Sequence, residues 1–142
     1  MINSSISAET IESAISWLAG FTEKPGEQGV TRPLYTKSWK QALFALRQRF
    51  EKLGMTVEFD QVGNLIATVE GCEKPESIIA CGSHIDTVSR GGRFDGQLGI
   101  VAAYLAIKNL LTRYGKPKKS LRIICLAAVS YTHLTLPTNR EV

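Results

Sequence analysis

Two residue types that build metal and disulfide sites are scarce in this sequence of 142 residues, which has two histidines and three cysteines. The histidines are His84 and His133, whereas a catalytic zinc site ordinarily uses about three protein ligands and a water. Cys72, Cys81 and Cys125 lack the close spacing of a zinc-binding motif. Two of these cysteines lie in apolar strand patterns, so we expect small buried side chains and no disulfide bond.

Long hydrophobic runs are also missing. No stretch approaches the roughly 20 apolar residues of a membrane-spanning helix, and the N-terminus lacks the basic and then apolar pattern of a signal peptide. Hydrophobic residues make up 44% of the chain and charged residues 21%, as in an ordinary globular domain with its own core. We therefore expect a cytoplasmic protein with no membrane partner.

Acidic residues are nearly absent after Asp95, where Glu141 is the only one, and the net charge of the chain is +4. Basic residues gather in segment 113–119, where a predicted helix ends, and no series of aromatic residues accompanies them. Basic side chains are favoured at the C-terminal end of a helix. We interpret the segment as a solvated helix end and expect no nucleic-acid partner.

Apolar residues at helical spacing predict three helices. The first has Ser7 as its candidate N-cap and ends before Gly20. The second begins after Thr36, ends at Gly54 and carries a stripe of core residues, namely Trp39, Leu43, Leu46, Phe50 and Leu53. The third spans residues 96–114 and is apolar on most sides, so we expect it to pack deeply against a sheet.

Four further segments predict strands. Residues 55–59 alternate between apolar and polar, and a turn at Gly63-Asn64 leads into the run 65–69, which predicts a hairpin at the edge of a sheet. Residues 77–83 and 121–129 are nearly continuous apolar runs, typical of buried parallel strands. With helix 96–114 between them, these two strands form a β-α-β crossover, so the sequence predicts an α/β fold.

The end of the predicted strand 77–83 carries candidate metal ligands. His84 and Asp86 follow it two residues apart, at the sheet edge where α/β proteins bind ligands. A neutral imidazole binds zinc, and a carboxylate on its other ring nitrogen fixes its orientation, the role that suits Asp86. Asp95 follows a flexible Gly-Gly pair, so a second carboxylate can return to the same ion. The alternative is an Asp-rich turn beside a histidine with an ordinary hydrogen bond.

Segments 82–88 and 91–99, Gly-Ser-His-Ile-Asp-Thr-Val and Gly-Gly-Arg-Phe-Asp-Gly-Gln-Leu-Gly, resemble the M20 metallopeptidase-like amidohydrolases. The resemblance is to the branch with N-carbamoyl-L-amino acid hydrolases, β-ureidopropionases and allantoate amidohydrolases. It extends through segments 29–39 and 59–65 and covers residues 8–129. The Thr-Arg-x-Leu-Tyr-x-x-x-Trp form of segment 31–39 is most similar to allantoate amidohydrolases. The resemblance singles out Arg32, for which a surface arginine is the alternative.

This resemblance implies the N-terminal part of a three-layer α/β catalytic domain of the zinc-peptidase type, with a mixed sheet. It implies a hydrolase of ureido or carbamoyl C–N bonds, most similar to the enzymes of purine catabolism that convert allantoate to ureidoglycine, ammonia and carbon dioxide. N-carbamoyl-L-amino acid hydrolase and β-ureidopropionase are the alternatives. It also implies two divalent metal ions, zinc or manganese: His84 binds one, Asp95 bridges both, and Asp86 is the catalytic residue that orients His84. The parent enzyme is expected to be a homodimer that acts on a small ureido substrate.

Two glutamates follow the strand 121–129 in the resembled family, one as the general base and one as a metal ligand. Ser130 and Tyr131 stand in their places, and residues 130–142 do not continue the family pattern. We therefore expect residues 1–129 to be the N-terminal portion of the catalytic domain and 130–142 to be a non-native tail. A diverged native terminus is the alternative, and His133 is not expected to bind metal.

Because one histidine and one aspartate are too few ligands for a firm metal site, we expect weak or incomplete metal binding and an inactive chain. A small non-catalytic α/β domain is therefore the alternative from another functional class. The family's substrate-selecting residues are expected in polypeptide that this sequence does not contain.

Overall fold

The computed structural model describes residues 8–127 and 129, which form three helices and four strands. In chain order these are α1 (Ala8–Ala19), α2 (Lys37–Lys52), β1 (Thr56–Phe59), β2 (Leu65–Val69), β3 (Lys74–His84), α3 (Gln97–Tyr114) and β4 (Lys119–Leu126). The expected cap at Ser7 and the expected non-native tail 130–142, with His133, lie outside these residues. No helix in the described part of the chain is both long and apolar enough to cross a membrane.

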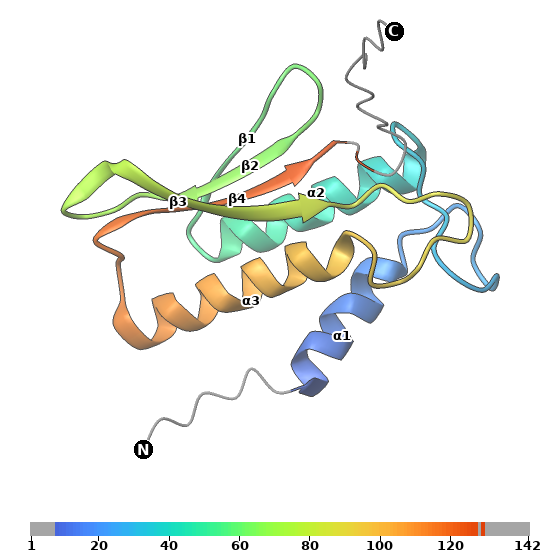
Figure 1. The fold of residues 1–142 in the computed structure, drawn as a ribbon, viewed down its shortest axis with the longest axis horizontal. Coiled ribbons are helices and arrows are strands. Elements are labelled where there is room, and N and C mark those ends of the chain that lie inside the picture. Colours follow the sequence, from blue (N-terminus) through green and yellow to red (C-terminus); the bar gives the residue numbers. More distant parts are fainter. Residues whose placement is uncertain (1–7, 128, 130–142) are drawn as a thin grey trace, which may run out of the picture.

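The strands form one mixed sheet in the order β1-β2-β4-β3 (Figure 1). β1 pairs antiparallel with β2, β2 pairs antiparallel with β4, and β4 pairs parallel with β3. The predicted hairpin at a sheet edge and the β-α-β crossover through α3 are both confirmed. All three helices lie on the same side of this sheet, so the described residues build one helical layer and one sheet layer of the α/β fold (Figure 1).

The second helix illustrates how local sequence signals set the element bounds. Thr36 is the N-cap of α2, and its hydroxyl oxygen accepts a hydrogen bond from the backbone N–H of Trp39 at 3.4 Å. This bond satisfies one of the N–H groups that a helix leaves free at its start. The predicted apolar stripe faces the core, with Leu43 and Phe50 almost completely buried. This burial fixes α2 against β1 and β2.

The core lies between the sheet and the helices. Leu65, Ala67 and Val69 alternate with half-exposed residues along β2, so one face of this strand packs against the helical layer. Ile123 of β4 and Ile100 of α3 are fully buried in the same cluster. This packing fixes the central strands β2 and β4, and their ends are fixed with them.

The prediction that strand 77–83 is buried is wrong. Ile78 and Ile79 of β3 are 44% and 56% exposed, and Cys81 is exposed as well. The physical reason is position, because β3 is the last strand of the described sheet and the described helices cover only one sheet face. Of the three cysteines only Cys125 is buried, so the expected burial of Cys81 is also wrong; all three are free thiols.

Helix α3 is likewise less enclosed than its composition predicts. Leu98 and Leu110 are 42% and 43% exposed, whereas Val101 and Leu105 are buried. The helix buries one face against β3 and β4 and contacts α1 along another. Its apolar residues outside those contacts face solvent in the described part of the chain.

Candidate functional site

The candidate site lies where β3 ends and the chain turns through residues 85–96 into α3. His84 is the last residue of β3 and is 9% exposed. The turn brings the start of α3 directly against its ring: a Cβ atom added to Gly96 would lie 2.6 Å from His84 Cε1 and 2.7 Å from His84 Nδ1. Gly96 also has a φ of 68°, which favours glycine. A glycine is therefore required for this close approach between strand end and helix start.

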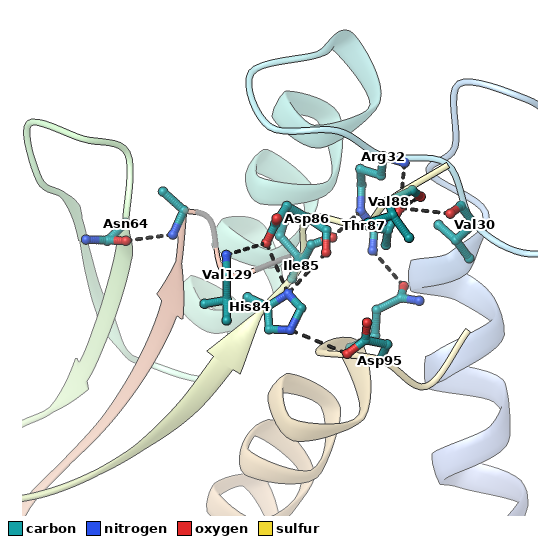
Figure 2. Close-up of polar contacts among 12 residues, drawn as sticks. Val30, Arg32, Asn64, His84, Ile85, Asp86, Thr87, Val88, Asp95 and Val129 are labelled. Carbon is teal, nitrogen blue, oxygen red and sulfur yellow. Dashed lines mark hydrogen bonds and ion pairs between the residues drawn. The ribbon is translucent and has the colours of Figure 1, made fainter. Parts of the chain in front are cut away.

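His84 and Asp86 contact each other as the sequence predicts. His84 Nδ1 lies 3.0 Å from Asp86 Oδ1 and 3.1 Å from the backbone oxygen of Asp86 (Figure 2). The Asp86 side chain is completely buried, and its Oδ1 also accepts the backbone N–H of Val129 at 3.1 Å. When Nδ1 carries the proton and donates it to this carboxylate, Nε2 presents a lone pair, the form of imidazole that binds a metal.

Asp95 lies on the other side of the imidazole. Its Oδ1 is 3.6 Å from His84 Nε2, and its side chain is 61% exposed (Figure 2). This separation is too long for a hydrogen bond. Two ligands with bonds of about 2.0 Å to one tetrahedral zinc ion would be about 3.3 Å apart. His84 Nε2 and the Asp95 carboxylate therefore fit two corners of a coordination sphere that opens to solvent.

The two groups do not complete a metal site. Within residues 8–127 and 129 there is no cluster of three or more His, Cys, Asp and Glu side chains suited to a metal ion. A catalytic zinc site uses about three protein ligands. The described residues thus bring together only two potential ligands, His84 and Asp95, with Asp86 turned toward the ring nitrogen that faces away from Asp95.

Arg32, which the sequence left open as a surface residue, is completely buried. Burial lowers the pKa of its guanidinium to about 10, and the negative charge of Asp86 acts in the opposite direction. The side chain therefore remains protonated at neutral pH. Its hydrogen bonds reach Ile85, directly after His84, and Gln97, directly after Gly96. The alternative of a surface arginine is wrong.

Three residues near the site were not predicted from the sequence to belong to it. They are Asn64, which contacts the end of β4, Gly96, which permits the approach to His84, and Gln97, which contacts Arg32. All three lie inside segments 59–65 and 91–99 that carry the family resemblance. Their presence in those segments was the available signal, but their contacts depend on residues distant in sequence.

Comparisons with known proteins find several relatives, although no protein-family model matches the chain. A Bacillus subtilis protein named allantoate amidohydrolase is 43% identical over 117 residues, which is 82% of this chain and 28% of that protein. An Arabidopsis thaliana protein named ureidoglycolate hydrolase is 38% identical over 84% of this chain and 25% of that protein. A Paenarthrobacter aurescens protein named N-carbamoyl-L-amino-acid amidohydrolase is 39% identical over 73% of this chain and 25% of that protein.

The chain is also similar to a solved structure. The crystal structure of a hydantoinase/carbamoylase family amidase from Burkholderia ambifaria superposes with a TM-score of 0.78 at 30% sequence identity, over 84% of this chain and 29% of that one. The chain thus spans between a quarter and a third of the length of these four proteins. These similarities show that the chain belongs to the family that includes the proteins named allantoate amidohydrolase and N-carbamoyl-L-amino-acid amidohydrolase.

Proposed function

We propose that His84 and Asp95 are metal ligands of an amidohydrolase that cleaves a ureido or carbamoyl C–N bond, and that Asp86 orients His84. The observation that carries the proposal is the pair of contacts on one imidazole: a buried carboxylate on Nδ1 and an exposed carboxylate 3.6 Å from Nε2. A histidine that binds metal usually donates its other ring N–H to such a partner. An ordinary core histidine does not need the second, solvent-facing carboxylate.

Two divalent ions, zinc or manganese, are the proposed cofactors of the parent enzyme. A bound divalent ion supplies electrostatic stabilisation to a carbonyl oxygen and makes a water more acidic. This chain's own contribution is to hold the imidazole in one tautomer through Asp86 and to present the Asp95 carboxylate beside it. The remaining ligands and the general base would come from polypeptide that this sequence does not contain.

Allantoate is the substrate that we propose, with ureidoglycine, ammonia and carbon dioxide as products. The support is the 43% identity to a relative named allantoate amidohydrolase. The Thr-Arg-x-Leu-Tyr-x-x-x-Trp form of segment 31–39, which contains Arg32, supports the same substrate. Ureidoglycolate and N-carbamoyl-L-amino acids are alternatives, because relatives with those names have comparable identity over this segment. A cytoplasmic location and a homodimer of the parent enzyme are parts of the same proposal.

A second candidate is an α/β domain that binds a metal weakly, or none, without catalysis. The specific observation in its favour is that the described residues contain no group of three potential metal ligands. The first candidate requires hydrolysis that depends on a metal bound at His84, whereas the second has no catalytic activity. An experiment that measures both metal binding and hydrolysis can decide between them.

The test combines metal binding with hydrolysis. Mn²⁺ is added to the isotope-labelled chain, and the broadening of NMR signals near His84 and Asp95 is followed in the wild type, in His84→Ala and in Asp95→Asn. We expect local broadening in the wild type that needs at least about tenfold more Mn²⁺ in either variant, because each loses one of few ligands. Broadening that is spread over the whole chain, or that needs the same Mn²⁺ concentration in both variants as in the wild type, would contradict the proposal that His84 and Asp95 bind the metal.

Because the chain itself lacks the general base, ammonia release from allantoate, ureidoglycolate and an N-carbamoyl-L-amino acid is then measured in the parent enzyme, with and without added Zn²⁺ or Mn²⁺. Hydrolysis that requires the metal and disappears in His84→Ala supports the enzyme. Local metal binding without any hydrolysis supports the second candidate. Hydrolysis that persists without metal would contradict the proposed chemistry.

A further inference from the structure

The guanidinium of Arg32 joins three separate segments of the chain. Its Nε donates to the backbone oxygen of Ile85 at 2.7 Å, at the end of β3. One terminal nitrogen donates to the backbone oxygens of Leu18 and Phe21 at 2.7 and 2.9 Å, at the end of α1. The other donates to Gln97 Oε1 at 2.7 Å, in the first turn of α3. One side chain thus links α1, β3 and α3.

This arrangement makes a buried positive charge tolerable. The Arg32 side chain is completely buried, and the negative charge of Asp86 favours its charged form. The last carbonyl groups of a helix carry a partial negative charge and lack partners within the helix, so they favour a cation there. Leu18 O is such a group. A buried charge with four hydrogen bonds is expensive to rearrange, so these contacts define one geometry.

Gln97 extends the contact of Arg32 toward Asp95. Its side chain is completely buried, accepts from Arg32, and donates from Nε2 to the backbone oxygen of Arg93 at 2.8 Å. Its backbone N–H donates to the backbone oxygen of Asp95 at 2.8 Å. Gln97 therefore holds Arg93 through its side-chain amide and Asp95 through its backbone N–H. Arg32 in turn holds the Gln97 side chain.

Arg32 also fixes the other end of this loop through its own backbone. Its N–H donates to Thr87 Oγ1 at 2.8 Å, and its backbone oxygen accepts the N–H of Thr87 at 2.9 Å. With the bond to Ile85 O, these contacts surround Asp86 on both sides. Segment 85–96 contains Gly91, Gly92 and Gly96, which would make it costly to order without such anchors.

We propose that Arg32 is a positioning residue: by holding Ile85 and Thr87 at one end of segment 85–96 and Gln97 at the other, it sets the separation between His84 and Asp95. The functional meaning of this inference rests on the proposed metal site. A metal site requires its ligands within about 0.5 Å of the productive geometry. A lysine would keep the charge, but its single ammonium group cannot span the acceptors that a planar guanidinium reaches together.

The first experiment needs no metal. Amide hydrogen exchange is measured for segment 85–97 and for β2 in the wild type, Arg32→Lys, Gln97→Asn and the control Arg49→Lys. Arg49 also connects α1 to a neighbouring element, because its guanidinium stacks on Trp17 with 3.5 Å to the ring centroid, and its other ring contact is with Tyr104 of α3. In Arg32→Lys and Gln97→Asn we expect exchange in segment 85–97 to accelerate on the order of tenfold more than exchange in β2.

In Arg49→Lys the two regions should change by the same factor. Equal acceleration of segment 85–97 and β2 in Arg32→Lys would overturn the inference, since it would show that Arg32 supports overall stability only. If Arg32→Lys does not fold, Gln97→Asn decides. Its shorter side chain loses the link between Arg32 and the start of α3, and with it the bond to the Arg93 backbone oxygen, while the other contacts of Arg32 remain.

The second experiment uses Mn²⁺ with the same four proteins. We expect Arg32→Lys and Gln97→Asn to need at least about tenfold more Mn²⁺ for broadening near His84 and Asp95, with Arg49→Lys unchanged. Unchanged Mn²⁺ dependence in both site variants would overturn the inference. If the wild type itself shows no local broadening, the proposed metal site fails, and the exchange comparison alone decides whether Arg32 positions the segment.

Discussion

Asn64, in the turn between β1 and β2, accepts a hydrogen bond of 2.6 Å from the backbone N–H of Ala127 at the end of β4 (Figure 2). The Asp60 carboxylate orients this amide, accepting from Asn64 N at 2.9 Å and from Asn64 Nδ2 at 2.6 Å. Two residues farther along, the N–H of Val129 donates to Asp86. The hairpin thus holds the segment that contacts the buried carboxylate beside His84.

The first prediction concerns this hairpin contact. Replacing Asn64 by alanine leaves the N–H of Ala127, a residue only 6% exposed, without its acceptor. An unsatisfied buried donor costs about 1–3 kcal/mol, so the free energy of unfolding should fall by that amount in urea titrations. Gln61→Ala, an exposed position in the same turn, should change it by less than about 0.5 kcal/mol. Similar losses in the two variants would contradict a specific role for Asn64.

The second prediction concerns Asp86. Asp86→Asn keeps the size of the side chain but removes the negative charge that makes the His84 imidazole a better metal ligand. Loss of such a partner costs about 10- to 100-fold in metal affinity, so the Mn²⁺ concentration that broadens the signals of Asp95 should rise by that factor. Glu58→Gln removes an exposed charge from β1 and should leave the metal titration unchanged. An Asp86→Asn protein that titrates as the wild type does would show that the contact is not linked to metal binding.

Local sequence signals predicted most elements, because periodicity and capping act within one turn or one strand. The stripe from Trp39 to Phe50 and the turn at Asn64 needed no knowledge of the rest of the chain. The meeting of His84, Asp86 and Asp95 followed from a strand, a glycine-containing loop and a helix that are consecutive in sequence.

The wrong predictions concern burial, which depends on where a residue lies in the folded chain. Ile79 has the composition of a buried strand but lies at the sheet edge, which no pattern within 77–83 reveals. Arg32 carries a charge that predicts exposure, and its partners Leu18 and Gln97 are 14 and 65 positions away in sequence. Burial of a polar side chain depends on such distant acceptors, so it could be recognised only in the folded chain.

The third prediction uses the cysteines as probes of this fold. Cys72 and Cys81 are exposed and Cys125 is completely buried. Burial raises the pKa of the Cys125 thiol strongly and that of Cys81 to a lesser degree, which reduces the reactive thiolate of both. Alkylation at pH 8, followed by peptide mass spectrometry, should label Cys72 and Cys81 in the native chain and Cys125 only after unfolding. Native labelling of Cys125 at the rate of the other two would contradict the packing of β4.

The fourth prediction concerns acid stability and the start of α2. Glu23 Oε1 accepts the backbone N–H of Ser38 at 2.7 Å, one of the free N–H groups of the first helical turn. The backbone hydrogen bond from Ser38, followed by that from its side chain, lowers the pKa of Glu23 below its ordinary value of 4.5. The unfolded chain therefore binds the proton more readily than the folded chain. The stabilisation by Glu23 is present above pH 4.5 and is lost as the pH falls through the lowered pKa.

Thermal unfolding measured between pH 6 and pH 3 checks this sign. The midpoint temperature of the wild type should decline on acidification more steeply than that of Glu23→Gln, whose neutral amide does not titrate. Some decline should remain in that variant, because hydrogen bonds from Asn64 also lower the pKa of Asp60. Glu58→Gln, which removes an exposed carboxylate from β1, should retain the wild-type slope. Parallel curves for the wild type and Glu23→Gln would mean that the Glu23 carboxylate does not stabilise the start of α2.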